Sequence, residues 1–125
     1  EKGEIPASEK PQLFSTYFTG LFRSMRFGTE SAHGRGAKLQ YGYLQQKGAF
    51  AWDDAAQRYT VDYAAMEAAI RDLLNAQLML QAKGDYAGTI AFFDRYAVLD
   101  AAAQSRFAAM DDIPVDIAPV YPDGV

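Results

Sequence analysis

The sequence predicts a mainly α-helical fold of about five helices in an antiparallel array, with one small β-hairpin and an extended C-terminal arm. Along most of the chain, apolar residues recur at steps of three and four, which is the spacing of one helix face. An aspartate precedes three of these stripes, at a position where its side chain can cap the helix. Near the C-terminus, prolines at positions 114, 119 and 122 favour extended backbone over helix.

The first predicted helix runs from Gln12 to just before Gly28. Its apolar stripe is strongly aromatic and consists of Leu13, Phe14, Tyr17, Phe18, Leu21, Phe22 and Met25. So broad a stripe has to be buried against other parts of the chain. Residues 1–11 are mostly polar and contain two prolines, so we expect a flexible lead-in there. Residues 12–125 are then expected to form a single helical domain.

The second predicted helix follows Thr29 or Ser31, either of which can cap it, and ends near Gly48. It contains glycines at positions 34, 36 and 42, and each costs about 1 kcal/mol relative to alanine inside a helix. Some other interaction has to compensate for this loss of helix stability.

His33, the only histidine, lies near the start of this second helix. One helix face consists of His33, Gly36, Ala37, Gln40 and Leu44. Because so little side-chain bulk surrounds the imidazole, another helix or a bound chain can approach this face closely. The alternative is a tight helix crossing around a core histidine.

The rest of the chain gives a hairpin and three capped helices. Residues 49–52 and 58–61 are aromatic or β-branched and flank a polar segment, which predicts a hairpin. The paired aspartates at positions 53 and 54 fit turn chemistry better than calcium binding, because no EF-hand spacing surrounds them. Asp62 is expected to cap a helix to about Lys83, Asp85 the next helix, and Asp100 a last one to Met110.

Composition excludes several classes of function. The net charge of −4 argues against a nucleic-acid partner. With no cysteine and one histidine, the chain has no thiolate metal site and no His-Glu-x-x-His motif, so we expect it to bind no metal. No apolar run is long enough for a membrane span, and no signal peptide is visible, so a cytoplasmic location is expected.

Several short segments of the sequence resemble segments from the C-terminal part of the dipeptidyl-peptidase III family of zinc peptidases, most closely its bacterial members. The most specific are Leu21-Phe-Arg-Ser-Met-Arg-Phe-Gly28 and Ala32-His-Gly34. The similarity continues through Tyr43-Leu-Gln-Gln-Lys-Gly-Ala-Phe50, Gly84-Asp-Tyr-Ala-Gly88 and the proline-rich stretch 112–122. It covers most of the chain from about Leu13 onward.

The resemblance implies that the chain is the C-terminal, helical part of a larger enzyme that removes dipeptides from peptide N-termini. Zinc in that enzyme would be bound by motifs outside this chain, so this part alone is expected to be inactive. The partners implied are the remainder of the parent chain and a peptide substrate, with no membrane.

The same resemblance gives His33 a role. It matches a family histidine that lies near the zinc and contacts the substrate or its oxyanion. Better-known members carry an arginine four residues later, where this chain has Ala37. Arg26, Arg35 and Lys38 are the nearby cations expected to help bind substrate, although a cation near the end of a helix, such as Arg26, also suits the helix dipole.

Two other functions remain open at the level of sequence. The chain could be a helical interaction or regulatory module, joined in some proteins to a nudix hydrolase domain. It could also be an independent small-ligand helical domain. Nudix chemistry cannot reside in the chain itself, because no Gly-x5-Glu-x7-Arg-Glu box is present.

Overall fold

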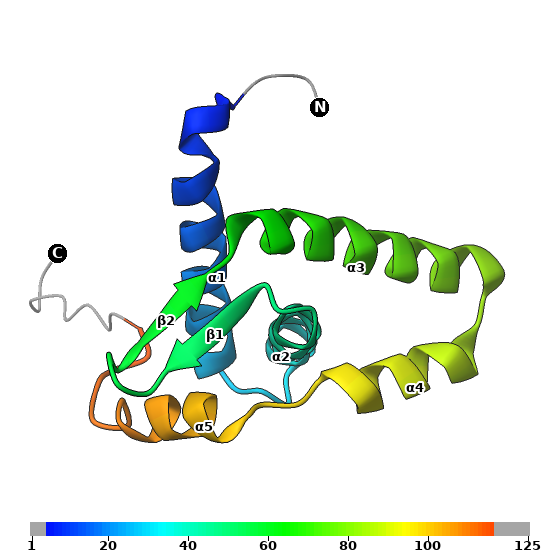
Figure 1. Ribbon diagram of the computed structural model, residues 1–125. Coiled ribbons are helices and arrows are strands. Elements are labelled where there is room, and N and C mark those ends of the chain that lie inside the picture. Colours follow the sequence, from blue (N-terminus) through cyan, green and yellow to red (C-terminus); the bar gives the residue numbers. More distant parts are fainter. Residues whose placement is uncertain (1–4, 117–125) are drawn as a thin grey trace, which may run out of the picture.

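The structure is a computed structural model that describes residues 5–116, and it confirms the predicted mainly α-helical fold (Figure 1). Its α-helices and its hairpin follow one another in the predicted order. In chain order the elements are η1 (Ala7–Glu9), α1 (Lys10–Arg26), α2 (Ala32–Gln46), β1 (Phe50–Asp53), β2 (Arg58–Val61), α3 (Tyr63–Lys83), α4 (Tyr86–Tyr96) and α5 (Ala101–Ala108).

Side-chain caps begin four of the helices, as the local sequence predicted. Asp62, Asp85 and Asp100 each accept a hydrogen bond from the backbone N–H three residues later, at 2.9, 2.7 and 2.8 Å. Ser31, rather than Thr29, caps α2 by accepting from Gly34 N at 3.1 Å. These bonds satisfy backbone donors that have no partner inside the helix.

Two helix ends differ from the predicted ones. Helix α1 begins at Lys10, with Pro11 in its first turn, so part of the stretch expected to be a lead-in is helical. A proline is tolerated there because a first-turn N–H has no helical acceptor. Helix α5 ends at Ala108, two residues before the expected Met110. Most of the predicted C-terminal arm, residues 117–125, lies outside the described residues.

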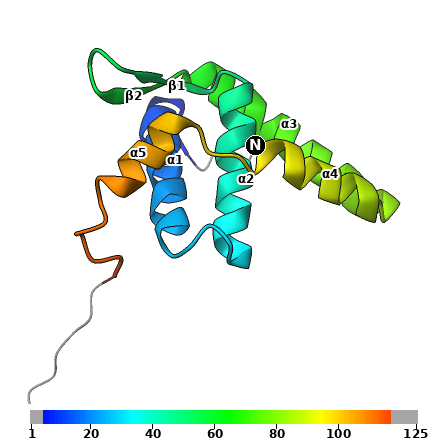
Figure 2. The ribbon, with the colours of Figure 1, turned by 90° about the horizontal axis from the view of Figure 1, so that it is seen from below.

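Helices α1 and α2 form the centre of the molecule, and the hairpin lies against them (Figures 1 and 2). Strand β1 pairs antiparallel with β2, with Phe50 opposite Val61 and Trp52 opposite Tyr59. Helix α5 lies below the hairpin in Figure 1, and α3 and α4 extend together away from α1.

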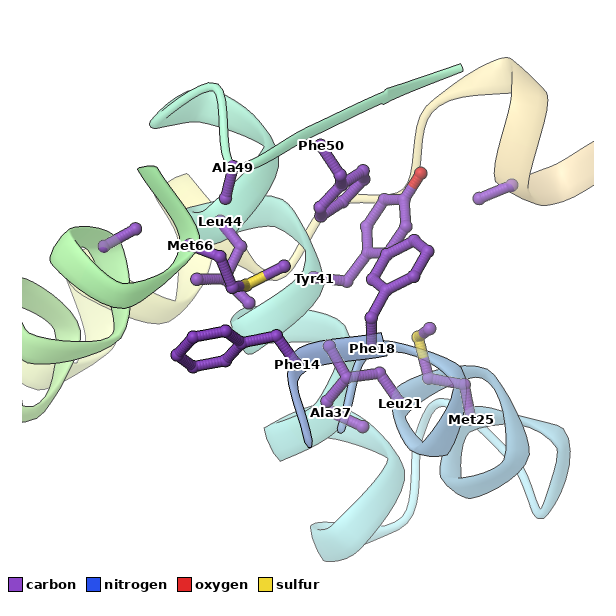
Figure 3. Packing of buried hydrophobic residues seen from close by; sticks show 12 residues of the cluster. Phe14, Phe18, Leu21, Met25, Ala37, Tyr41, Leu44, Ala49, Phe50 and Met66 are labelled. Atoms are coloured by element: carbon purple, nitrogen blue, oxygen red, sulfur yellow. The ribbon is translucent and has the colours of Figure 1, made fainter. Parts of the chain in front are cut away.

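The main core lies between α1, α2 and the hairpin and contains several packed aromatic rings (Figure 3). Met66 and Ala69 of α3 and Ala103 of α5 complete it. The ring of Phe50 lies 4.5 Å from that of Phe18 and 4.9 Å from that of Tyr41, centroid to centroid. The buried Tyr41 hydroxyl donates to Asp100 Oδ1 at 3.1 Å and lies 3.3 Å from the Tyr59 hydroxyl. Asp100 therefore caps α5 and also satisfies a polar group of the core.

A smaller core connects α2 to the pair formed by α3 and α4. It consists of Leu39, Tyr43 and Leu73, with Phe92, Phe93, Tyr96 and Ala97 packed against them. No residue of α4 is fully buried. This end of the molecule therefore has far less internal packing than the end built on α1.

An aromatic and cationic contact joins the hairpin to α5. The Arg106 guanidinium lies over the ring of Trp52, with its central carbon 4.9 Å from the ring centroid. A contact of this kind between a guanidinium and an indole is favourable. It connects α5 to the hairpin, whereas the hydrogen bonds of Asp100 connect α5 to Tyr41 and Gln45 of α2.

Candidate functional site

His33 occupies the second position of α2, and its side chain is exposed. No hydrogen bond joins its ring to another of the residues 5–116. The alternative of a core histidine is therefore wrong, and the imidazole is available to a partner. The capped start of α2 fixes the backbone that carries it.

The glycines of α2 have different structural reasons. A Cβ at Gly34 would lie 1.8 Å from the Gly28 carbonyl oxygen, and one at Gly42 would lie 2.0 Å from the Tyr96 carbonyl oxygen. Both positions therefore need glycine for packing within this domain. Gly34 therefore leaves no room for another helix or a bound chain to approach beside His33. At Gly36 a Cβ would have no described atom within 4 Å apart from its own stretch of helix, so among the three glycines of α2 this one leaves open space.

A polar row continues from His33 along the same face of α2. Gln40 lies beyond Gly36, and its amide nitrogen donates to the Gly36 carbonyl at 3.2 Å. The Tyr17 hydroxyl of α1 donates to Gln40 Oε1 at 2.6 Å. These bonds hold the Gln40 amide in one orientation. We call His33, Gly36, Gln40 and Tyr17 the His33 row.

Burial raises the pKa of Tyr17 to about 12, so its phenol is neutral at ordinary pH and acts as a hydrogen-bond donor. The His33 row therefore offers an imidazole, a bare stretch of backbone and an amide that the neutral Tyr17 phenol holds in place. Groups of these kinds suit hydrogen bonding to peptide backbone.

The rest of the face that the sequence grouped around His33 is covered by the protein itself. Ala37 and Leu44 are buried in the main core with Phe14, Phe18 and Leu21 of α1. The open part of the face is consequently narrower than the sequence predicted. It is confined to the first turns of α2.

No contact found among residues 5–116 brings the three predicted substrate-binding cations to His33. Arg26 donates to the backbone carbonyls of Met110 and Ile113. Lys38 Nζ lies 3.6 Å from Glu30 Oε1, and Glu30 is largely exposed.

Arg35, the third cation, stacks on α4, with its guanidinium carbon 5.4 Å from the Phe93 ring centroid. Each of the three cations thus has a contact within the domain. A role in substrate binding stays a prediction for all of them.

The described residues form neither a cluster for a metal ion nor a helix that could span a bilayer. Among residues 5–116, no group of three or more histidine, cysteine, aspartate or glutamate side chains could hold a metal ion. None of the helices in this range combines the length and apolar character that a bilayer span requires.

Sequence reasoning missed Tyr17 as a member of the row and treated it only as part of the aromatic stripe of α1. Its hydroxyl reaches Gln40, which is 23 residues away along the chain. A tyrosine rather than a phenylalanine in an apolar stripe was the available signal, because a buried hydroxyl needs a partner.

Comparison with known proteins relates this fold to peptidases. The structure of dipeptidyl-peptidase III from Caldithrix abyssi matches 95% of this chain with a TM-score of 0.87 and 37% identity. The structure of dipeptidyl-peptidase III from Corallococcus sp. strain EGB matches 95% of it with a TM-score of 0.85 and 30% identity. This chain covers only 23% and 22% of those two chains.

A curated relative carries a different name. Nudix hydrolase 3 of Arabidopsis thaliana is 32% identical over 123 residues, which are 97% of this chain but 16% of that protein. No protein-family model matches the chain. At 30–37% identity and with nearly the whole chain superimposed, this chain resembles one segment, about a fifth, of bacterial dipeptidyl-peptidase III in both sequence and fold.

Proposed function

We propose that this chain is the C-terminal part of a dipeptidyl-peptidase III-like zinc peptidase and that the His33 row forms part of its substrate cleft. The observation that carries the proposal is the exposed imidazole beside the open space at Gly36. The likeness to two dipeptidyl-peptidase III structures supports it. Residues 12–125 would then be one helical domain of the parent enzyme, preceded by the rest of that chain.

In this proposal the chain supplies binding groups and no metal ligand. The His33 N–H would donate a hydrogen bond to the carbonyl oxygen of the scissile peptide, and more strongly to the negative charge that develops there. Gly36 would let the substrate backbone approach α2, and the Gln40 N–H that does not donate to the Gly36 carbonyl would be available to the same backbone. Zinc, when bound by the parent enzyme, would polarise the scissile carbonyl. Because the chain lacks that metal site, we expect it to be inactive alone.

The test is His33→Ala in the full-length parent enzyme, assayed on a dipeptide-releasing substrate. Loss of one oxyanion donor lowers kcat by about 10²–10³-fold, and kcat/KM should fall by a similar factor. The exposed position of His33 means that the melting temperature should hardly change. His33→Asn keeps a donor and should retain part of the rate, and Gln46→Ala, exposed on the same helix, serves as the control. Wild-type rates for His33→Ala would remove the row from the cleft.

A second candidate function has its own support. In it, the chain is a helical regulatory or interaction module joined to a nudix domain, and the similarity of nearly all of this chain to Nudix hydrolase 3 supports that reading. The coding sequence upstream of Glu1 separates the two. A His-Glu-x-x-x-His motif there supports the peptidase, and a nudix box without that motif supports the joined module.

A further inference from the structure

A groove lies between α3 and α4, at the end of the molecule with the smaller core. Its cavity volume is about 310 Å³. Leu74, Leu78, Phe92 and Phe93 provide most of its apolar wall, and Gln77 and Gln81 provide polar groups. We call it the α3–α4 groove.

The groove leaves more apolar side-chain surface exposed to solvent than a closed hydrophobic core does. Leu74 and Leu78, which line it, are 55% and 52% exposed, and Ile90 of α4 is 46% exposed. Helix α4 has an apolar composition but no fully buried residue. Contiguous apolar surface of this kind marks a place where another chain or domain packs.

The chemistry of the groove lining limits which kinds of partner can bind there. Every groove-lining residue in the described part of the chain is apolar, an amide or a hydroxyl, although the whole chain carries a net charge of −4. An uncharged wall of leucine and phenylalanine fits a leucine-rich helix face, with hydroxyl or amide groups opposite Gln77 and Gln81. None of the described lining residues carries a charge that could pair with a strongly charged segment.

We infer that the α3–α4 groove seats an apolar helix from the remaining part of the parent chain. This inference rests on the proposed function, because it requires that the chain be one part of a larger protein. The similar proteins are four to six times longer than the matched part, since this chain spans 16–23% of each. That remaining length supplies the occupant, and packing in the groove attaches this domain at the end opposite the hairpin.

The test is site-specific photo-crosslinking in the full-length parent protein. A photo-reactive phenylalanine analogue replaces Leu78 in one variant and Met79 in the other. Met79 is the matched control because it is the next residue on α3 and 46% exposed but does not line the groove. We expect Leu78 to crosslink within one molecule to an apolar helix outside residues 1–125, and Met79 to give no such product.

A second measurement does not depend on the photo-reactive analogue, whose own bulk could disturb packing in the groove. Leu78→Glu should lower the melting temperature of the full-length protein by several degrees more than Met79→Glu, because a buried carboxylate in an apolar seam is costly. Crosslinks between two copies, no crosslink at Leu78, or equal effects of the two glutamates would overturn the inference. If these fail while His33→Ala still lowers kcat/KM as expected, the groove assignment alone is wrong and the proposed function stands.

Discussion

At the scale of single residues, two glycines of the same helix have opposite consequences for substitution. Gly42 faces the Tyr96 carbonyl oxygen, and an added Cβ would lie 2.0 Å from it. Gly36 faces open space. The pair therefore separates a glycine that the fold requires from one that the fold does not require.

We predict that Gly42→Ala destabilises the protein by about 3 kcal/mol, because backbone atoms have to shift to admit the new methyl group. Gly36→Ala should instead stabilise it by up to about 1 kcal/mol through higher helix propensity. Denaturant unfolding of both variants measures this difference. In the parent enzyme, Gly36→Ala should still lower kcat/KM if the substrate passes over this position. Equal stability of the two variants would contradict the predicted difference.

The buried tyrosines give the protein a predictable response to alkaline pH. Burial raises the pKa of Tyr17 to about 12 from an ordinary value of about 10, and it also raises the pKa values of Tyr41 and Tyr59. Between about pH 10 and 12 the unfolded state therefore binds fewer protons than the folded state. The free energy of unfolding should fall as the pH rises through this interval.

Tyr17→Phe tests this dependence, since it removes one of the three phenols. The variant should show a shallower loss of stability above about pH 10, measured by denaturant unfolding at a series of pH values. Tyr63→Phe is the control, because the Tyr63 side chain is 40% exposed. A slope unchanged by Tyr17→Phe but reduced by Tyr63→Phe would show that another environment controls the titration.

At the scale of elements, the aspartate caps differ in how much each one holds together. Asp62 accepts a bond from Ala65 N at the start of α3. Asp100 caps α5 and also accepts from the Tyr41 hydroxyl and from the Gln45 amide. One side chain thus connects α5 to α2.

We expect Asp62→Ala to cost about 1 kcal/mol, the usual value for a lost cap. Asp100→Ala should cost about 2–4 kcal/mol, because it also leaves the buried Tyr41 hydroxyl without its carboxylate acceptor. Thermal unfolding of both variants gives the comparison. The double variant Tyr41→Phe with Asp100→Ala should lose less than the sum of the two single losses, since the groups interact directly.

The elements also show which parts of the fold could be predicted. Helix starts depend on residues within one turn, so Asp62, Asp85 and Asp100 were readable from the sequence. The reasons for Gly34 and Gly42 were not, because the atoms that exclude a side chain belong to Gly28 and Tyr96, whose position follows only from tertiary packing. The candidate site could likewise be predicted only in part. The exposure of His33 agrees with the functional hypothesis drawn from the sequence. The link from its row through Gln40 to Tyr17 could not be predicted, because it joins two helices.

At the scale of the whole molecule, packing is uneven. The main core joins α1, α2 and the hairpin, and the end formed by α4 and the second half of α3 has only the smaller core (Figures 1 and 2). Regions with few buried apolar contacts open at lower free energy than the global unfolding transition.

We therefore expect native-state hydrogen exchange of the 125-residue chain to be uneven. Backbone amides of α4 and of the second half of α3 should exchange faster than those of α2. The same amides should become more protected in the full-length parent protein if the α3–α4 groove is filled there. Uniform protection across α2 and α4 in the isolated chain would contradict the unequal packing.

The contact between Trp52 and Arg106 gives the protein an intrinsic fluorescent probe. Trp52 is the only tryptophan, and the guanidinium of α5 covers its ring. When α5 detaches, the indole loses that cover and meets water, so its emission spectrum changes. Fluorescence excited at the red edge of the indole band, where the eight tyrosines do not absorb, therefore reports the docking of one named helix without an attached dye.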